Sequence, residues 1–252
     1  MAWLTAGGWL LLMLLPLVYL EQWVHRHLQG VWLLLLRHEE SAIIMYSILM
    51  LPGVLLHESS HWLAATLLGV RAGRFSVVPE RLPNGTLRLG YLETDKPDLI
   101  REALIGLAPL VTGAAAIIFM GYARLGVGPV GDALARTDLV ETARGLAAMT
   151  QVKDFWLWLY LVFAVSNSML PSASDRRAWL PVLLMAVVIV AVVVYLGLGA
   201  ALVEAFGGIA EAALRALAAA FTITVGIDLC LAPFIWAAER GLMKLTGLRL
   251  EY

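Results

Sequence analysis

The stretch "VLLHESSHWL", residues 54–63, places metal-binding and acid–base side chains inside an apolar run. His57 and His61 are four residues apart, so on a helix their imidazoles share one face and can reach one metal ion. Glu58 follows the first histidine and can reach a water on that metal. This is the H-E-x-x-H pattern of two zinc ligands and a general base. Ionisable groups at membrane depth are costly and usually functional, which favours a metal site over an interfacial polar loop.

A zinc site that is open for catalysis takes three protein ligands and a water. The acids near apolar runs that are candidates for the third ligand are Asp154, Asp175, Glu204 and Asp228. The stretch "FAVSNSMLPSASDRRAW", residues 163–179, favours Asp175. An apolar helix is expected to run into Asn167 and to break at Pro171, because proline stops a helix, and Asp175 lies just past that break. A broken helix at membrane depth is tolerated where it lines a cavity.

The composition is that of a membrane protein. The chain has 252 residues, of which 61% are hydrophobic and 15% are charged, and its mean hydropathy is +0.82. Soluble domains carry roughly a quarter charged residues. The formal net charge of −1 offers no basic surface for nucleic acid, and a single cysteine, Cys230, excludes a disulfide within the chain. The N-terminal apolar run has no preceding Lys or Arg and no small-x-small cleavage site, which favours a retained helix over a signal peptide.

The apolar runs predict an all-α polytopic membrane protein with about six transmembrane helices, since a crossing needs about 20 apolar residues. The candidate spans are 2–20, 41–70, 101–123, 154–171, 179–203 and 216–238. Residues 21–40 are mixed in character and form either an interfacial helix or a continuation of the first span. Residues 204–215 are expected to form an interfacial turn or a helix start.

Two segments between the spans carry further signals. Residues 71–98 contain an Asn84-Gly85 turn after Pro83, flanked by the β-prone stretches "RFSVV" and "TLRLGYLE". This pattern predicts a small β-hairpin after the H-E-x-x-H helix. Residues 124–153, with charges of both signs, are expected to form a loop with a short surface helix.

The Lys and Arg distribution predicts the orientation of the chain in the membrane. With six spans, the side that holds the hairpin and the C-terminus carries eleven Lys and Arg residues, and the other side carries seven. This bias places the hairpin 71–98 and the C-terminus in the cytoplasm, and the expected location is a bacterial plasma membrane.

These residues together resemble the site-2 protease family of intramembrane zinc metalloproteases. In that family an H-E-x-x-H helix is followed by a later helix with an asparagine, a proline-containing stretch and an aspartate eight residues after the asparagine; Asn167, Pro171 and Asp175 match this order. Residues 106–113, "GLAPLVTG", resemble a degraded form of the family's Gly-Pro-x-x-Asn element. The chain departs from the family pattern in having Arg176 where a glycine follows the aspartate, in the position of its proline, and in having no PDZ domain.

The resemblance implies a catalytic core at residues 41–180, preceded by N-terminal transmembrane or interfacial helices at 1–40 and followed by C-terminal transmembrane helices at 181–252. It implies Zn²⁺ held by His57, His61 and Asp175, with Asn167 helping to bind the substrate backbone. Glu58 would be the general base that activates a zinc-bound water as nucleophile. The expected function is hydrolysis of peptide bonds in membrane protein or peptide substrates within the lipid bilayer.

Two other functions are compatible with these residues: a membrane protein of this fold that binds metal or a partner without hydrolysis, and a transporter with an intramembrane ion path. The transporter would be expected to show internal pseudo-symmetry, and the sequence has none. Asp228 would either pair with a neighbouring helix or support a polar cavity. The other three histidines, His25, His27 and His38, are expected to be interfacial, and the small residues Gly106, Gly113 and Gly121 to be sites of close helix packing.

Overall fold

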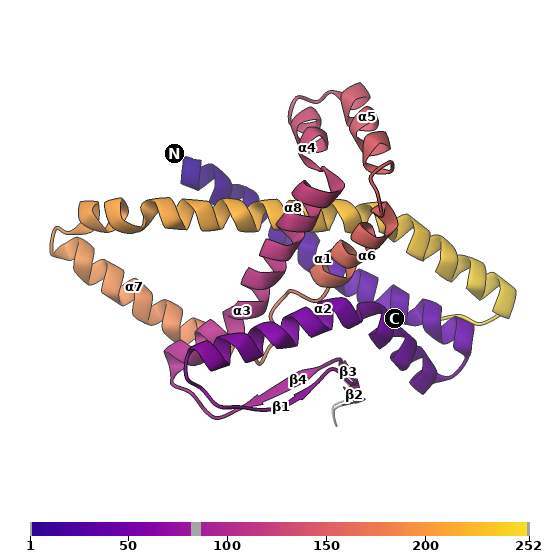
Figure 1. The fold of residues 1–252 in the computed structure, drawn as a ribbon, viewed down its shortest axis with the longest axis horizontal. Coiled ribbons are helices and arrows are strands. Elements are labelled where there is room, and N and C mark those ends of the chain that lie inside the picture. The colour runs from indigo at the N-terminus through magenta and orange to yellow at the C-terminus, as the bar shows by residue number, and fades with distance from the viewer. Residues whose placement is uncertain (1, 82–86, 251–252) are drawn as a thin grey trace.

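The computed structural model describes residues 2–81 and 87–250, most of which are helical (Figure 1). Four helices are long and apolar enough to cross a membrane. They are α1 (Ala2–Leu36), α2 (Glu39–Leu67), α3 (Leu99–Ile118) with its π-helical continuation η1 (Phe119–Leu125), and α8 (Gly199–Thr246). Two shorter apolar helices are α6 (Phe155–Ser166) and α7 (Trp179–Tyr195). The structure therefore supports a polytopic helical membrane protein, and a count of six crossings stays a prediction.

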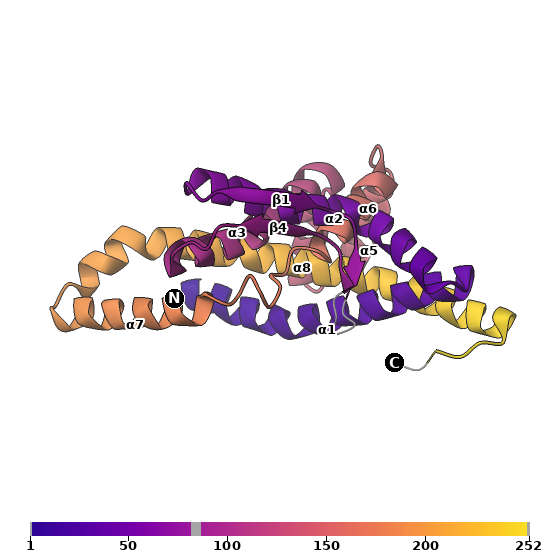
Figure 2. The ribbon, with the colours of Figure 1, turned by 90° about the horizontal axis from the view of Figure 1, so that it is seen from below.

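The two longest helices settle the boundaries that the sequence left open. Helix α1 continues past Pro16 to Leu36, so residues 21–36 prolong the first helix, and Glu39 and Glu40 already begin α2. Helix α8 has 48 residues and includes the segment 204–215 together with the apolar run 216–238. At 1.5 Å per residue α8 is about 72 Å long, more than twice the hydrocarbon thickness of about 30 Å. It is thus longer than a single crossing requires, and α1 packs along it (Figures 1 and 2).

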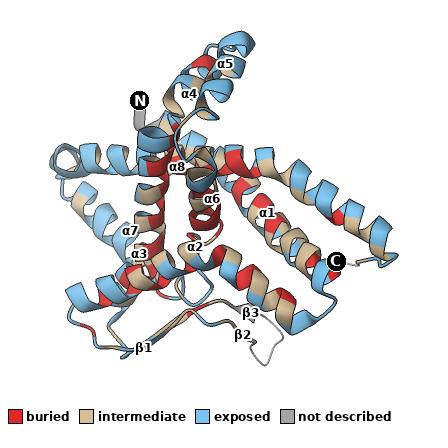
Figure 3. Cartoon of the chain, turned by 45° about the vertical axis from the view of Figure 1, so that its right-hand side comes forward, coloured by how far each residue is buried: buried red, intermediate tan, exposed pale blue. Residues whose placement is uncertain are grey.

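The core forms where α2, α3 and α6 meet this long pair. Figure 1 shows α3 running across α8 instead of alongside it. The buried residues are concentrated on α3, on α6 and on the facing sides of α1 and α2 (Figure 3). Fully or almost fully buried side chains in this core include Leu17, Val24, Tyr46, Met50, Ile117, Val162 and Phe221.

Small residues allow the helices of the core to approach closely. A Cβ atom built on Gly53 of α2 would lie 2.0 Å from the carbonyl oxygen of Ala164 in α6. A Cβ on Gly113 of α3 would lie 2.6 Å from Cβ of Met169, in the segment that follows α6. Neither position can carry a larger side chain without moving its neighbour, which fixes α6 and the following segment against α2 and α3.

A β-hairpin follows α2, as the sequence predicts. Strand β1 (Ala72–Ser76) pairs antiparallel with β4 (Tyr91–Thr94), with Phe75 opposite Leu92, and the register is irregular between Ala72 and Phe75. Nearer the tip, β2 (Glu80–Arg81) pairs with β3 (Leu87–Arg88). The Asn84-Gly85 turn lies outside the described residues. Figure 1 shows the hairpin extending along α2.

The segment 124–153 contains two short helices where one was expected. They are α4 (Gly128–Ala135) and α5 (Leu139–Met149), which pack on each other. Figure 1 shows them projecting from the end of α3 away from the hairpin. None of the residues of α5 is buried.

Candidate metal centre

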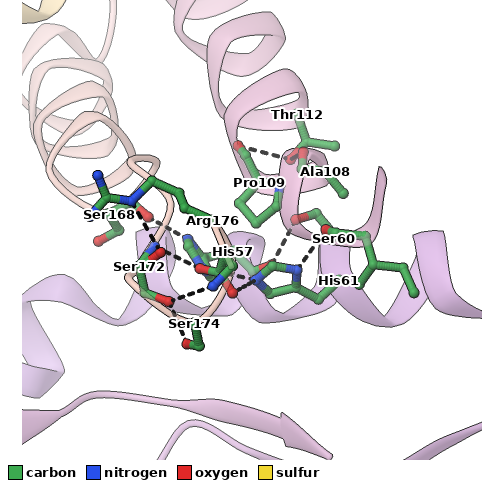
Figure 4. Close-up of polar contacts among 12 residues, drawn as sticks. His57, Ser60, His61, Ala108, Pro109, Thr112, Ser168, Ser172, Ser174 and Arg176 are labelled. Atoms are coloured by element: carbon green, nitrogen blue, oxygen red, sulfur yellow. Dashed lines mark hydrogen bonds and ion pairs between the residues drawn. The ribbon is translucent and has the colours of Figure 1, made fainter. Parts of the chain in front are cut away.

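His57 and His61 lie on consecutive turns of α2, and each imidazole is held by a backbone carbonyl (Figure 4). His57 Nδ1 is 2.6 Å from the carbonyl oxygen of Ser168, and His61 Nδ1 is 2.9 Å from that of Ile105. Because a carbonyl oxygen only accepts hydrogen bonds, Nδ1 carries the proton in both rings. When each ring is neutral, as it must be to bind a metal, its lone pair would lie on Nε2, the arrangement that metal-binding histidines use.

Asp175 joins the two histidines from the segment between α6 and α7. Its Oδ2 lies 3.6 Å from His57 Nε2, its Oδ1 lies 3.4 Å from His61 Nε2, and the two Nε2 atoms are 3.1 Å apart. Two ligand atoms bound at about 2.0–2.1 Å to a tetrahedral zinc ion are separated by about 3.3–3.4 Å. The three side chains thus form a group with the spacing and the donor types of a zinc site, and they could hold a metal ion.

The chain around Asp175 holds its carboxylate toward the histidines. The backbone N–H of Ser172 donates to Oδ2 at 2.7 Å, and the backbone N–H of Asp175 donates to Ser172 Oγ at 3.3 Å. Burial raises the pKa of Asp175, but the contacts with His57 and His61 and the bond from Ser172 outweigh burial and bring its pKa below the usual range. The carboxyl group is therefore ionised, as a metal ligand must be.

Gly106 of α3 makes room for this segment. A Cβ atom at position 106 would lie 2.1 Å from the carbonyl oxygen of Asp175. Its neighbour Ile105 supplies the carbonyl that binds His61. This turn of α3 therefore touches two of the three candidate ligands.

Helix α6 ends earlier than the sequence predicts. Its last residue is Ser166 and Asn167 is its C-cap, so the helix stops before Pro171 instead of breaking at it. The residues from Ser168 onward lie outside a regular helix, which frees the carbonyl of Ser168 to accept from His57. Pro171 lies within the irregular segment that leads to Asp175.

Glu58 of α2 is buried, with 8% of its surface exposed, and its side chain faces the hairpin. A Cβ atom on Gly90, which precedes β4, would be 2.9 Å from Glu58 Cγ and 3.0 Å from the carbonyl oxygen of Ser76. The hairpin backbone therefore comes into close contact with Glu58 only because position 90 is glycine. The candidate base is next to His57 in the chain, and the hairpin packs against its side chain at Gly90.

Asn167 is almost completely buried, with 2% of its surface exposed. Its Nδ2 donates to the carbonyl of Phe163 at 3.0 Å and to Asp228 Oδ1 at 2.9 Å. Both hydrogens of the amide are thus used inside the protein. Its Oδ1 has no hydrogen-bond partner among the described residues, so substrate binding by Asn167 stays a prediction.

The structure decides between the two alternatives for Asp228, which pairs with a neighbouring helix through Asn167. It also gives two histidines interhelical partners where interfacial positions were expected. His27 Nδ1 donates to Glu239 Oε2 of α8 at 2.6 Å, and His25 Nδ1 is hydrogen bonded to the hydroxyl of Tyr46 in α2. The available sequence signal was Glu239 itself, a carboxylate at the end of the apolar run 216–238, because an ionisable group at membrane depth needs a partner; the structure leaves only 2% of its surface exposed.

Other predicted residues lie apart from the ligands. Thr112, in the degraded Gly-Pro-x-x-Asn element, donates to the carbonyl of Ala108 in its own helix at 3.0 Å (Figure 4). Asp154 is the N-cap of α6 and Glu204 is exposed on α8. His38 is exposed, and its Nδ1 is 3.4 Å from the hydroxyl of Ser41.

No family model, curated protein or solved structure matches this chain. The resemblance to the site-2 protease family therefore rests on the motif residues and on the geometry that brings them together.

Proposed function

We propose that this protein is an intramembrane zinc metallopeptidase of the site-2 protease type. One observation carries the proposal: both imidazoles are fixed through Nδ1 to backbone carbonyls, and their Nε2 atoms converge with Asp175 at zinc-ligand spacing. Histidines that only fill a core do not need this common orientation. The H-E-x-x-H order adds a general base at the position next to the first ligand.

His57, His61 and Asp175 would hold the zinc ion, leaving a fourth position open. A bound zinc ion would act as a Lewis acid that lowers the pKa of a water and polarises the scissile carbonyl. Glu58 would accept a proton from that water and return it to the leaving amine. Its position on the ligand helix, directly after His57 and under the hairpin, supports this role because a general base must lie next to the water that it deprotonates.

The substrate would be a membrane protein or peptide. A peptide bond in a helix is shielded by its own hydrogen bonds, so the substrate must be locally unwound before it reacts. The β1–β4 ladder has two strands, so each strand has an edge without a ladder partner in this sheet. An extended peptide could add to such an edge, with the hairpin facing the cytoplasm of a bacterium.

The proposal is tested by metal content and cleavage measured on the same purified protein. The wild type should contain one zinc per chain, and His57→Ala and Asp175→Ala should each lose it while remaining folded. The wild type should also cleave a model transmembrane substrate. A folded wild type that binds no zinc after incubation with it would overturn the proposal.

A second candidate is a protein of the same architecture that binds metal or a partner without hydrolysis. The observation that favours it is the close cover of Glu58 by the hairpin at Gly90, which hinders access of a substrate to the base. The two functions differ in one result: zinc binding without any cleavage of unwound model substrates supports the second candidate.

A further inference from the structure

Asp228 is the one fully buried acid of the core among the described residues, and it lies outside the region that carries the motifs. It is on α8, with 0% of its surface exposed. Its Oδ1 accepts a hydrogen bond from Asn167 Nδ2 at 2.9 Å. This bond joins α8 to the residue that ends α6.

The segment that begins at Asn167 leads directly to two of the candidate ligands. The next residue, Ser168, uses its carbonyl to hold His57 Nδ1 at 2.6 Å. The same segment continues without regular helix to Asp175, which contacts both histidines. A displacement of Asn167 would therefore move the group that orients His57 and the segment that carries the third ligand.

We propose that Asp228 is a positioning residue for the metal centre, acting through its hydrogen bond to Asn167. This inference rests on the proposed zinc site and assigns a role in it to α8. The remaining oxygens, Asp228 Oδ2 and Asn167 Oδ1, are both buried without hydrogen-bond partners among the described residues. An asparagine at position 228 could accept the existing bond and donate a second one to Asn167, so the pair needs a hydrogen-bonding side chain of this shape and not a negative charge.

The test measures zinc affinity by chelator competition, and thermal unfolding without metal, for the full-length protein in detergent. Asp228→Ala should weaken zinc binding about 10- to 100-fold, the usual effect of removing a group that orients a ligand. Asp228→Asn should bind zinc within about threefold of the wild type. The matched control is Thr224→Val, one turn earlier on α8, because Thr224 is also buried, with 1% of its surface exposed, but its hydroxyl donates to Ala220 of its own helix at 3.0 Å. The control should keep the wild-type affinity even if its unfolding temperature falls.

The outcomes separate this inference from the proposed function. A wild type without zinc overturns the proposed function itself. Wild-type affinity in Asp228→Ala, in a chain that does bind zinc, overturns only the role of Asp228. Equal losses in Asp228→Asn and Asp228→Ala would mean that the charge acts on the site and would contradict positioning. If Asp228→Ala does not fold, Asn167→Ala breaks the same bond from the other side and should show the same 10- to 100-fold loss; wild-type affinity there would also contradict the proposal.

Discussion

At the scale of single residues, the site depends on which nitrogen of each imidazole remains available. The carbonyls of Ser168 and Ile105 bind the Nδ1 atoms and leave both Nε2 atoms facing Asp175. Neither carbonyl is part of a recognisable motif, because any residue type supplies one. The metal-binding orientation of the histidines therefore depends on backbone groups of α3 and of the segment after α6.

Replacement of Glu58 by glutamine should separate metal binding from hydrolysis. The glutamine has nearly the same shape but accepts no proton at neutral pH, so Glu58→Gln should lower cleavage about 100-fold or more, within the range of general acid–base catalysis. Zinc content should stay at one per chain. Cleavage of a model transmembrane substrate and metal analysis are measured on the same preparation. An undiminished rate would remove Glu58 from the mechanism.

Substitution of Gly106 by alanine should weaken metal binding through the backbone of Asp175. A methyl group would approach the Asp175 carbonyl oxygen within 2.1 Å, so the ligand segment must shift. We expect zinc affinity to fall about tenfold or more, as for other changes around a ligand. Gly208→Ala is the matched control, because a Cβ there meets nothing within 4 Å. Equal affinities in the two variants would show that the segment adapts to the methyl group.

At the scale of secondary-structure elements, the site is built where α2, α3 and the connection between α6 and α7 come together. Helix α2 supplies two candidate ligands and the candidate base, α3 lets the connection approach closely at Gly106, and the connection supplies Asp175. The hairpin adds a cover, since its backbone at Gly90 contacts Glu58. The hairpin is thus the element best placed to influence how a substrate reaches the base.

Proline substitutions in β1 should slow cleavage and leave zinc bound. Proline removes a backbone N–H, so a substrate that adds to this strand would lose a hydrogen bond at one position. We expect at least one of Gly73→Pro, Arg74→Pro and Phe75→Pro to reduce cleavage about tenfold with one zinc retained per chain. Metal analysis is the control for folding of the site. If every zinc-loaded variant cleaves at the wild-type rate, the substrate does not bind by strand addition to β1.

At the scale of the whole molecule, the helices do not form a simple parallel bundle. Helices α1 and α8 pack along each other, whereas α3 crosses α8 (Figure 1). Helix α2, which carries His57 and His61, and the hairpin lie on one side of this crossing, and α4 and α5 project from the other side (Figure 1). The Lys and Arg distribution predicts that the hairpin lies on one face of the membrane and residues 124–153 on the opposite face, and this stays a prediction.

Cysteine labelling of intact cells should show this separation. The experiment uses a Cys230→Ser background and a membrane-impermeant thiol reagent added outside the cells. Arg74→Cys and Arg177→Cys should not be labelled, because both positions are expected in the cytoplasm. Gln151→Cys should be labelled. All three side chains are exposed on the protein itself. Labelling of the cysteines at positions 74 and 177 from opposite faces would contradict the topology. Labelling after permeabilisation is the control for reactivity.

The sequence by itself determined the membrane class, the presence of most helices and the common face of the two histidines. Apolar runs, the spacing of His57 and His61, and the β-prone flanks of a turn are local patterns, and local patterns predict local structure. The helices, the hairpin and the shared face of the two histidines follow from them. The choice of Asp175 agrees with its position beside the two histidines, although the expected break at Pro171 was wrong because α6 already ends at Ser166.

Only the tertiary structure decided the partners of the buried polar groups. The bond between Asn167 and Asp228 joins residues 61 positions apart, and His27 and Glu239 are 212 positions apart. A sequence indicates that a buried acid needs a partner, but the partner depends on which helices cross and at what depth. That arrangement is set by packing of side chains from distant segments, for which neither periodicity nor residue spacing carries a signal.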